Sequence, residues 1–250
     1  MPILLFGGID PSGGAGLSAD MRTLERFDCH SFPVPTCLTV QNSKGVERVV
    51  PVDGKLIEEM AESAINEGKI DGVKIGLCGD GNVVHSIEKI IKKYGLENVV
   101  LDTVFSAQAG GDLISEKTFS ELKKRLVPLA DILTPNLQEL RRLTGIGIHD
   151  EKDAVRACEK ALKLGCKAVA AKHLEKGRNV IDFYVDPERK EIYLKRKHLK
   201  GGTRGGGCVF STLLCYYLSR DSGAYESFIK AEKIMEYAKT RKIGNGIVVV

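Results

Sequence analysis

The chain has 250 residues, of which 43% are hydrophobic and 28% charged, and its formal net charge at pH 7 is +4. A chain of this length buries roughly 70–75% of its unfolded surface, so its core needs no disulfides. The basic residues form no block with interleaved aromatics, and tryptophan is absent, which excludes nucleic acid as an expected partner.

The N-terminal sequence "MPILLFGG" lacks the cationic segment of a signal peptide. No run approaches the roughly 18 apolar residues of a membrane span, so we expect a cytoplasmic protein without membrane contact. The seven cysteines include no C-x-x-C pair, which predicts reduced thiols and argues against zinc or redox motifs.

Short β-type runs alternate with segments of helical period along the chain. Strands are expected at residues 3–6, 32–38, 46–51, 72–75, 98–101, 132–133, 167–171, 180–185, 191–195 and 247–250, the last at a sheet edge. Helices are expected at residues 17–27, 55–66, 83–94, 115–126, 137–143, 152–164, 208–218 and 225–240. This alternation predicts one α/β domain over residues 1–250, with a mostly parallel sheet covered on both faces.

Ligands of such sheets bind beyond the carboxyl ends of the strands, where the first glycine-rich loop, "GGIDPSGGAG", lies at residues 7–16. Gly14 stands where a nucleotide-binding P-loop needs lysine. Asp10 and Asp20 would repel a phosphate and suit a neutral ligand with amino or hydroxyl groups. The alternative interpretation is that Pro11 and the glycines only form a tight turn between strand and helix.

The second loop, "GGTRGGGC" at residues 201–208, runs directly into an apolar helix. Unhindered backbone N–H groups at a helix N-terminus form an anion site, and Arg204 adds positive charge. Cys208 is expected as the first helical residue. It is either a core thiol on the face of Cys215 or a thiol whose pKa the helix terminus lowers.

The segment "TPNLQE" places Asn136 and Glu139 on the first turn after a strand. An acid and an amide on one face could hold a hydrated Mg²⁺ beside a nucleotide. Equally, Asn136 could cap the helix and Glu139 could favour its dipole. Asp102, after another strand, is a further candidate for a cation. Neither H-E-x-x-H nor G-x-S-x-G occurs, so nothing supports a zinc protease or a hydrolase.

Together these loops resemble motifs of the hydroxymethylpyrimidine phosphate kinases of thiamine biosynthesis, a branch of the ribokinase-like superfamily. The matching segments are "GGIDPSGGAGLSADMRTLERF", "LTVQNSKGV", "VKIGLCGD", "LADILTPNLQELRRLTG" and "GGGCVFSTLL". The resemblance implies a three-layer α/β/α sandwich. It also implies ATP-dependent phosphorylation, with Mg²⁺, of 4-amino-5-hydroxymethyl-2-methylpyrimidine and/or its monophosphate.

The resemblance implies roles by position. The expected substrate-binding residues are Gly8, Asp20, Gln41, Leu77 and Val104, with Asp20 and Gln41 hydrogen-bonding the aminopyrimidine. Cys208 would be the catalytic base beside an anion hole of Gly205, Gly206 and Gly207. The residues expected on the ATP side are Asn136, Glu139, Lys172, Thr203 and Arg204, with Asp102 and Glu139 toward Mg²⁺.

Several positions depart from the related motifs, including Gln108, where a basic residue is usual, and the C-terminal "GNG", where many members have histidines. Thr103 replaces proline in D-P-V-M, Arg204 replaces histidine, Gly206 replaces threonine in G-T-G-C, and Lys172 lacks the two following glycines. Two alternative functions therefore stay open: a pyridoxal or pyridoxine kinase, and a catalytically weak, pyrimidine-binding regulatory relative. The resemblance also implies a homodimer, because members of this family are commonly dimers.

Overall fold

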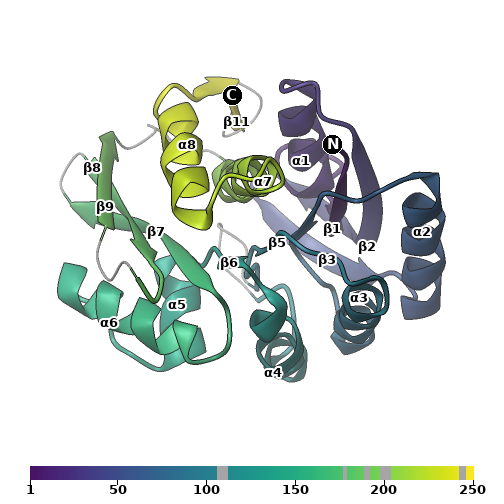
Figure 1. The fold of residues 1–250 in the computed structure, drawn as a ribbon, viewed down its shortest axis with the longest axis horizontal. Coiled ribbons are helices and arrows are strands. Elements are labelled where there is room, and N and C mark those ends of the chain that lie inside the picture. The colour runs from purple at the N-terminus through teal and green to yellow at the C-terminus, as the bar shows by residue number, and fades with distance from the viewer. Residues whose placement is uncertain (106–111, 177–178, 189–191, 198–203, 242–245) are drawn as a thin grey trace.

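The computed structural model describes residues 1–105, 112–176, 179–188, 192–197, 204–241 and 246–250 (Figure 1). Its main sheet has nine strands in the order β3-β2-β1-β4-β5-β6-β7-β8-β9. Their bounds are β1 Ile3–Ile9, β2 Ser31–Asn42, β3 Gly45–Pro51, β4 Gly72–Ile75, β5 Val99–Leu101, β6 Ile132–Leu133, β7 Ala168–Lys176, β8 Asn179–Val185 and β9 Ile192–Lys197.

The centre of the sheet is parallel and its edges are antiparallel. β2, β1, β4, β5, β6 and β7 pair in parallel, whereas β3 pairs antiparallel with β2, and β8 with β7 and β9. The central strands are short, apolar and buried, as expected for strands covered on both faces. The predicted mostly parallel sheet is therefore confirmed, and the strands expected at 180–185 and 191–195 pair antiparallel as β8 and β9.

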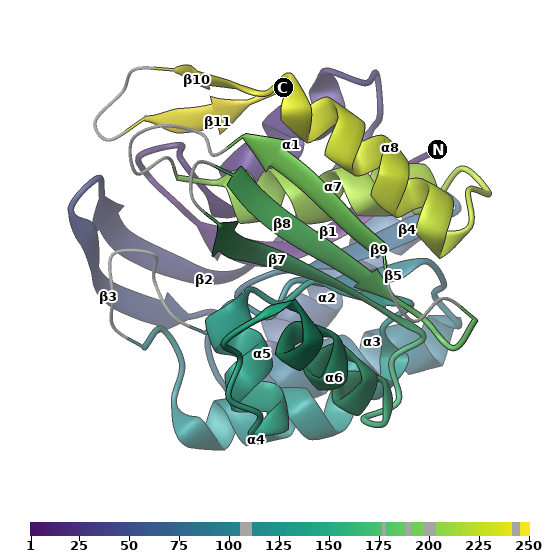
Figure 2. The ribbon, with the colours of Figure 1, turned by 90° about the vertical axis from the view of Figure 1, so that its left-hand side faces the viewer.

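In the part of the chain that the structure describes, eight α-helices cover the two faces of the sheet (Figures 1 and 2). One layer contains α2 Gly54–Glu67, α3 Gly81–Tyr94, α4 Glu116–Arg125, α5 Leu137–Thr144 and α6 Glu151–Leu162, with a 3-10 turn at Val127–Leu129. The opposite layer contains α1 Gly16–Glu25, α7 Gly206–Leu218 and α8 Ala224–Glu236. These three layers confirm the predicted α/β/α sandwich.

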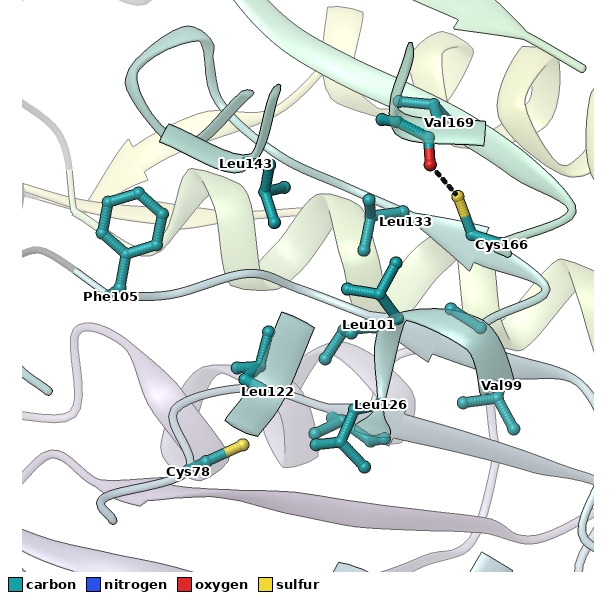
Figure 3. Packing of buried hydrophobic residues seen from close by; sticks show 14 of the residues in the cluster. Cys78, Val99, Leu101, Phe105, Leu122, Leu126, Leu133, Leu143, Cys166 and Val169 are labelled. Carbon is teal, nitrogen blue, oxygen red and sulfur yellow. Dashed lines mark hydrogen bonds between the residues drawn. The ribbon is translucent and has the colours of Figure 1, made fainter. Parts of the chain in front are cut away.

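The first of these layers encloses the larger apolar core. Figure 3 shows Leu101 and Leu133 of the sheet beside Leu122 of α4 and Leu126, the residue that follows α4. Burying one such leucine side chain stabilises the fold by about 1.5–3 kcal/mol. The α4 helix begins as predicted, because the side chain of Ser115 accepts a hydrogen bond from the backbone N–H of Thr118.

The C-terminal segment differs from the prediction. The expected helix 225–240 ends at Glu236, and Lys239–Arg241 form β10, which pairs antiparallel with β11, Ile247–Val249. The expected strand at 247–250 therefore forms, but in a separate two-stranded sheet, because both edges of the main sheet are occupied by antiparallel strands. Instead, β11 lies beside Arg204, whose carbonyl accepts a hydrogen bond from the Val248 N–H.

The seven cysteines are all free thiols, as predicted. Within the described ranges, no helix is long and apolar enough to cross a membrane.

Candidate active site at the carboxyl ends of the parallel strands

The segments that follow the parallel strands form one continuous edge. Backbone hydrogen bonds join each segment to its neighbour. The N–H groups of Gly76, Asp102, Thr134 and Lys172 donate to the carbonyl oxygens of Phe6, Ile75, Leu101 and Pro135, respectively. β2 and β3 project beyond this edge, on the left in Figure 2. The candidate residues after β1, β4, β5 and β6, together with Lys172 in β7, are thus aligned along one edge.

The first glycine-rich loop is organised around Asp10. The Asp10 carboxylate is 1% exposed and accepts hydrogen bonds from the N–H and hydroxyl of Ser12 and the N–H groups of Gly14 and Ala15, at 2.5–2.9 Å. A Cβ on Gly16, whose φ is +55°, would lie 2.2 Å from the Gly8 carbonyl oxygen. The loop forms the tight turn between strand and helix, and the Asp10 oxygens hold it, whereas a neutral ligand at this loop stays a prediction.

Asp20 lies beneath the site in a buried ion pair. One carboxylate oxygen accepts a hydrogen bond from Lys74 Nζ at 2.8 Å, and the other accepts one from Thr212 Oγ1 at 2.8 Å. Burial raises the pKa of Asp20, opposed by Lys74. Burial alone would lower the pKa of Lys74, but Asp20, Cys208 and Asp102 together raise it, so the ammonium stays charged.

The structure does not join Asp20 to Gln41. Gln41 is partly exposed and pairs with Val46 in the β2–β3 hairpin, three residues past Leu38, the last β2 partner of β1. Among the described contacts, none links Gln41 with Asp20. The expectation that both read one aminopyrimidine ring is therefore a prediction about the ligand-bound protein.

The second loop touches the first. A Cβ on Gly205, the N-cap of α7 with φ +83°, would lie 2.1 Å from the Gly14 carbonyl oxygen. A Cβ on Gly207 would lie 3.3 Å from Lys172 Nζ and 3.9 Å from Asp102 Oδ2. The amino end of α7 is therefore placed beside a buried cation, and only glycine permits the loops to approach so closely.

Cys208 is the third residue of α7, because the helix begins at Gly206 and not at Cys208 as expected. The residue as a whole keeps partial exposure, whereas Cys215 is fully buried. Burial raises the pKa of Cys208 to about 11, while Lys74 lowers it and Asp20 raises it. The alternative in which the helix terminus lowers this pKa is wrong, because desolvation of the thiolate exceeds the stabilisation by nearby positive charge.

Lys172 and Asp102 form a second buried ion pair. Lys172 Nζ donates to Asp102 Oδ1 at 2.9 Å, and the hydroxyls of Thr134 and Ser211 each donate to Asp102 at 3.1 Å. Burial disfavours the carboxylate, but Lys172 and Lys74 outweigh this effect and lower the pKa of Asp102. Asp102 is thus an ionised partner of Lys172, and its two oxygens are already engaged.

Asn136 and Glu139 form a capping box at the start of α5. Asn136 Oδ1 accepts from the Glu139 N–H at 2.9 Å, and Glu139 Oε2 accepts from the Asn136 N–H at 2.8 Å. The capping interpretation is confirmed. Thr103 Oγ1 also donates to Glu139 Oε2, at 3.1 Å. Burial raises the pKa of Glu139 to about 8, opposed by Lys172.

The remaining expected residues fall into three groups. A Cβ on Gly8 would lie 3.4 Å from Leu77 Cδ2, and both Leu77 and Val104 are partly exposed. Arg204, expected on the ATP side, instead extends its guanidinium over the first loop. Thr203 lies outside the described residues.

Lys74, Ser211 and Thr212 were not among the expected site residues. Lys74 and Thr212 donate hydrogen bonds to Asp20, and Ser211 donates one to Asp102. A usable signal was present in the strand "GVKI", where a lysine interrupts a buried apolar run. A lysine at such a position is rarely buried unless it is paired.

The arrangement brings together a glycine-lined helix terminus, two buried lysines, a thiol and an acidic side chain. Backbone N–H groups and a lysine at a helix terminus stabilise phosphate charge, which is what phosphoryl transfer requires of a protein. Among the described residues, no cluster of three or more His, Cys, Asp or Glu could hold a metal ion by itself. A cation would therefore need donors from a bound phosphate or from water.

Comparisons with solved structures give the same fold. The phosphomethylpyrimidine kinase of Clostridium difficile 630 matches with a TM-score of 0.83 and 30% identity, covering 95% of this chain and 98% of that one. The pyridoxal kinase of Bacillus subtilis matches with a TM-score of 0.87 and 24% identity, covering 99% and 96%. The ribokinase-like fold is thereby confirmed, and the pyridoxal kinase supports the fold alone.

Sequence comparisons identify the family. The hydroxymethylpyrimidine/phosphomethylpyrimidine kinase of Aquifex aeolicus is 34% identical over 257 residues, covering 98% of each chain. The kinase of the same description from Escherichia coli is 29% identical over 251 residues, covering 98% of this chain and 94% of that protein. The family pattern described as phosphomethylpyrimidine kinase matches residues 10–249. The chain belongs to the phosphomethylpyrimidine kinase family, whose members are phosphotransferases.

Proposed function

We propose that this protein transfers the γ-phosphoryl group of ATP to 4-amino-5-hydroxymethyl-2-methylpyrimidine and/or to its monophosphate, in thiamine biosynthesis. The observation that carries the proposal is the position of Gly207 at the amino end of α7, one residue before Cys208, where a Cβ would lie 3.3 Å from Lys172 Nζ. This geometry offers backbone donors in the first turn of α7, a fixed positive charge from β7 and, in Cys208, the expected proton acceptor.

In the first transfer, the hydroxymethyl oxygen forms a bond to the γ-phosphorus while the bond to the departing ADP oxygen breaks. The N–H groups of Gly205, Gly206 and Gly207 would bind the equatorial oxygens, and Lys172 would balance their charge. Cys208 would accept the hydroxyl proton. In phosphoryl transfer, positioning and charge balance contribute most of the rate, so the proton can leave late.

Glu139 is the best-placed donor for Mg²⁺ on the ATP side. Both described hydrogen bonds to its carboxylate reach Oε2, so Oε1 is the atom we expect to approach a hydrated cation. Carboxylate and phosphate oxygens suit this hard cation, which would neutralise phosphate charge when bound. Asp102, expected as a second ligand, is better explained as the counter-ion that keeps Lys172 charged and oriented.

Gly8, Leu77 and Val104 would line the pyrimidine pocket, since Gly8 approaches the Leu77 side chain and both apolar residues keep partial exposure. The side-chain amide of Gln41 would form a hydrogen bond with the pyrimidine ring. Asp20 would reach the substrate only if the ligand competes with Lys74 or Thr212 for one of its oxygens.

A coupled assay with hydroxymethylpyrimidine, its monophosphate, pyridoxal and no acceptor tests the proposal. We expect ADP release with one or both pyrimidines to exceed that with pyridoxal. Preferential turnover of pyridoxal would support the pyridoxal kinase alternative. Absence of turnover, with a pyrimidine-dependent rise in melting temperature, would support the weak regulatory relative.

We also propose a homodimer, supported by an apolar face on the β2–β3 hairpin. Leu38, Val40 and Val50 are 53%, 42% and 43% exposed, and Leu38 is registered opposite Val50. Exposed apolar side chains on one face of a projecting hairpin are typical of a contact surface. Light scattering after gel filtration should give twice the chain mass, and L38D should shift the protein to monomer.

A further inference from the structure

This inference rests on the proposed function and concerns how the two glycine-rich loops are held together. Arg204 precedes Gly205 directly, yet its side chain belongs to the other loop. Its Nη1 donates a hydrogen bond of 2.8 Å to the Ser12 hydroxyl and lies 3.8 Å from Asp10 Oδ2. Asp10 is fully buried, so this charge pair is screened less by solvent than a surface pair.

The backbone on both sides of the contact is also constrained. A Cβ on Gly14 would lie 2.9 Å from the Arg204 Cζ, so the guanidinium rests directly on the first loop. The Arg204 N–H donates to Gly246, and its carbonyl accepts from Val248. Arg204 is therefore fixed at its backbone by β11 and at its guanidinium by the first loop.

The hydrogen bonds form a chain from one loop to the other. Arg204 Nη1 donates to the Ser12 hydroxyl, and that hydroxyl donates to Asp10. The Asp10 carboxylate also accepts hydrogen bonds from the N–H groups of Gly14 and Ala15, and the Gly14 carbonyl lies against Gly205. A shift of the first loop would therefore move the N-cap of α7.

We propose that Arg204 is a positioning residue that clamps the phosphate loop, Gly205–Gly207, onto the first glycine-rich loop. The clamp sets the anion hole relative to the acceptor pocket without a direct bond to ATP. Small displacements matter in such a site, since a misplacement of about 1 Å can reduce a rate 10²-fold.

A double-mutant cycle of R204A and S12A tests the clamp, with kcat and the KM for ATP and for the pyrimidine measured separately. We expect R204A to lower kcat about 10-fold or more while each KM changes less than about 3-fold, since the loss is in positioning. S12A should lower kcat in the same direction, and the double variant should resemble R204A because both changes break one chain of contacts.

A direct phosphate role gives a different result. The Arg204 Nε is buried and has no hydrogen-bond partner among the described residues, so a bound phosphate oxygen is the partner that this alternative would supply. In that case R204A would raise the KM for ATP, S12A would leave kcat unchanged, and the two effects would be independent. This outcome overturns the clamp. R156A, at an exposed arginine of α6, is the matched control and should leave both constants unchanged.

Two further measurements keep the test decisive. Guanidinium at millimolar concentration should restore part of the kcat of R204A and none of that of S12A, because it replaces the missing cation. Urea unfolding of the ligand-free variants should show that R204A and S12A lower the free energy of unfolding in a coupled way. Additive losses of unfolding free energy overturn the clamp. This readout does not depend on activity, so it holds even if the wild type phosphorylates neither pyrimidine. If R204A does not fold, R204K takes its place in the cycle.

Discussion

Thr103 donates a hydrogen bond of 3.1 Å to Oε2 of Glu139, and both side chains are buried. The related motif D-P-V-M has proline at this position, which carries no hydroxyl. The contact favours the ionised form of Glu139 and lowers its pKa, against the larger effect of burial. We expect T103V to raise the pKa of Glu139 further and to increase the Mg²⁺ concentration needed for half-maximal turnover by several fold.

T103S is the matched control, because serine keeps the hydroxyl and removes only a methyl group. Its Mg²⁺ titration should stay close to that of the wild type. If T103V and T103S shift the Mg²⁺ titration equally, the hydroxyl does not tune Glu139, because serine keeps the hydroxyl that valine lacks. Kinase assays over a range of Mg²⁺ at fixed ATP decide between these results.

Glu139 also predicts a pH dependence of stability. Its pKa is raised to about 8 in the folded protein by burial, whereas a glutamate in an unfolded chain titrates near about 4.3. The folded state therefore holds a proton that the unfolded state releases, and the free energy of unfolding falls as pH rises from about 5 to about 8. The maximum slope is about 1.4 kcal/mol per pH unit.

E139Q isolates this contribution because glutamine resembles the protonated acid. The difference in unfolding free energy, E139Q minus wild type, should grow with pH across this interval and level off above it. Urea unfolding at several pH values measures the difference. A pH-independent difference would mean that Glu139 is already ionised at neutral pH in the folded protein.

The buried pair of Lys74 and Asp20 should contribute strongly to stability. K74M leaves the Asp20 carboxylate buried without its cation, which is expected to cost about 3–5 kcal/mol. The double variant K74M/D20N removes the charge as well and should recover part of that loss. Chemical denaturation of the two variants and D20N completes the cycle, and additive effects would show that the two charges are not coupled.

The elements that the sequence predicted well are those set by local pattern. The buried strand at Gly72–Ile75 and the helix after Ser115 have a clear apolar period or a cap. The C-terminal segment was predicted less well: its last strand forms, but it pairs with β10, where a helix was expected, and bridges to the distant residue 204, outside the main sheet. Periodicity alone does not reveal which sheet a short apolar strand joins.

The sequence predicted which residues lie at the site but not which residues they contact. The glycines of the second loop are where the sequence placed them, yet the contact of Arg204 with Ser12 joins residues 192 positions apart. Similarly, Asp20 was recognised as special, but its ion pair with Lys74 depends on the packing of α1 against the sheet. Burial also reversed the pKa shift expected of Cys208 at a helix terminus, because desolvation depends on tertiary packing that the local sequence does not show.

That raised pKa sharpens the prediction for Cys208. A thiol with a pKa of about 11 is almost fully protonated at pH 7, so the thiolate fraction increases about tenfold per pH unit below that value. If Cys208 is the proton acceptor, kcat/KM, which reports the free enzyme, should rise with pH from 7 to 9 without a plateau. C208A should lower kcat by about 10²–10⁴-fold and abolish this rise, while calorimetry still detects pyrimidine binding. A plateau near pH 7.5 would mean that the thiol ionises more easily than its burial indicates, and unchanged turnover by C208A would remove it from proton transfer.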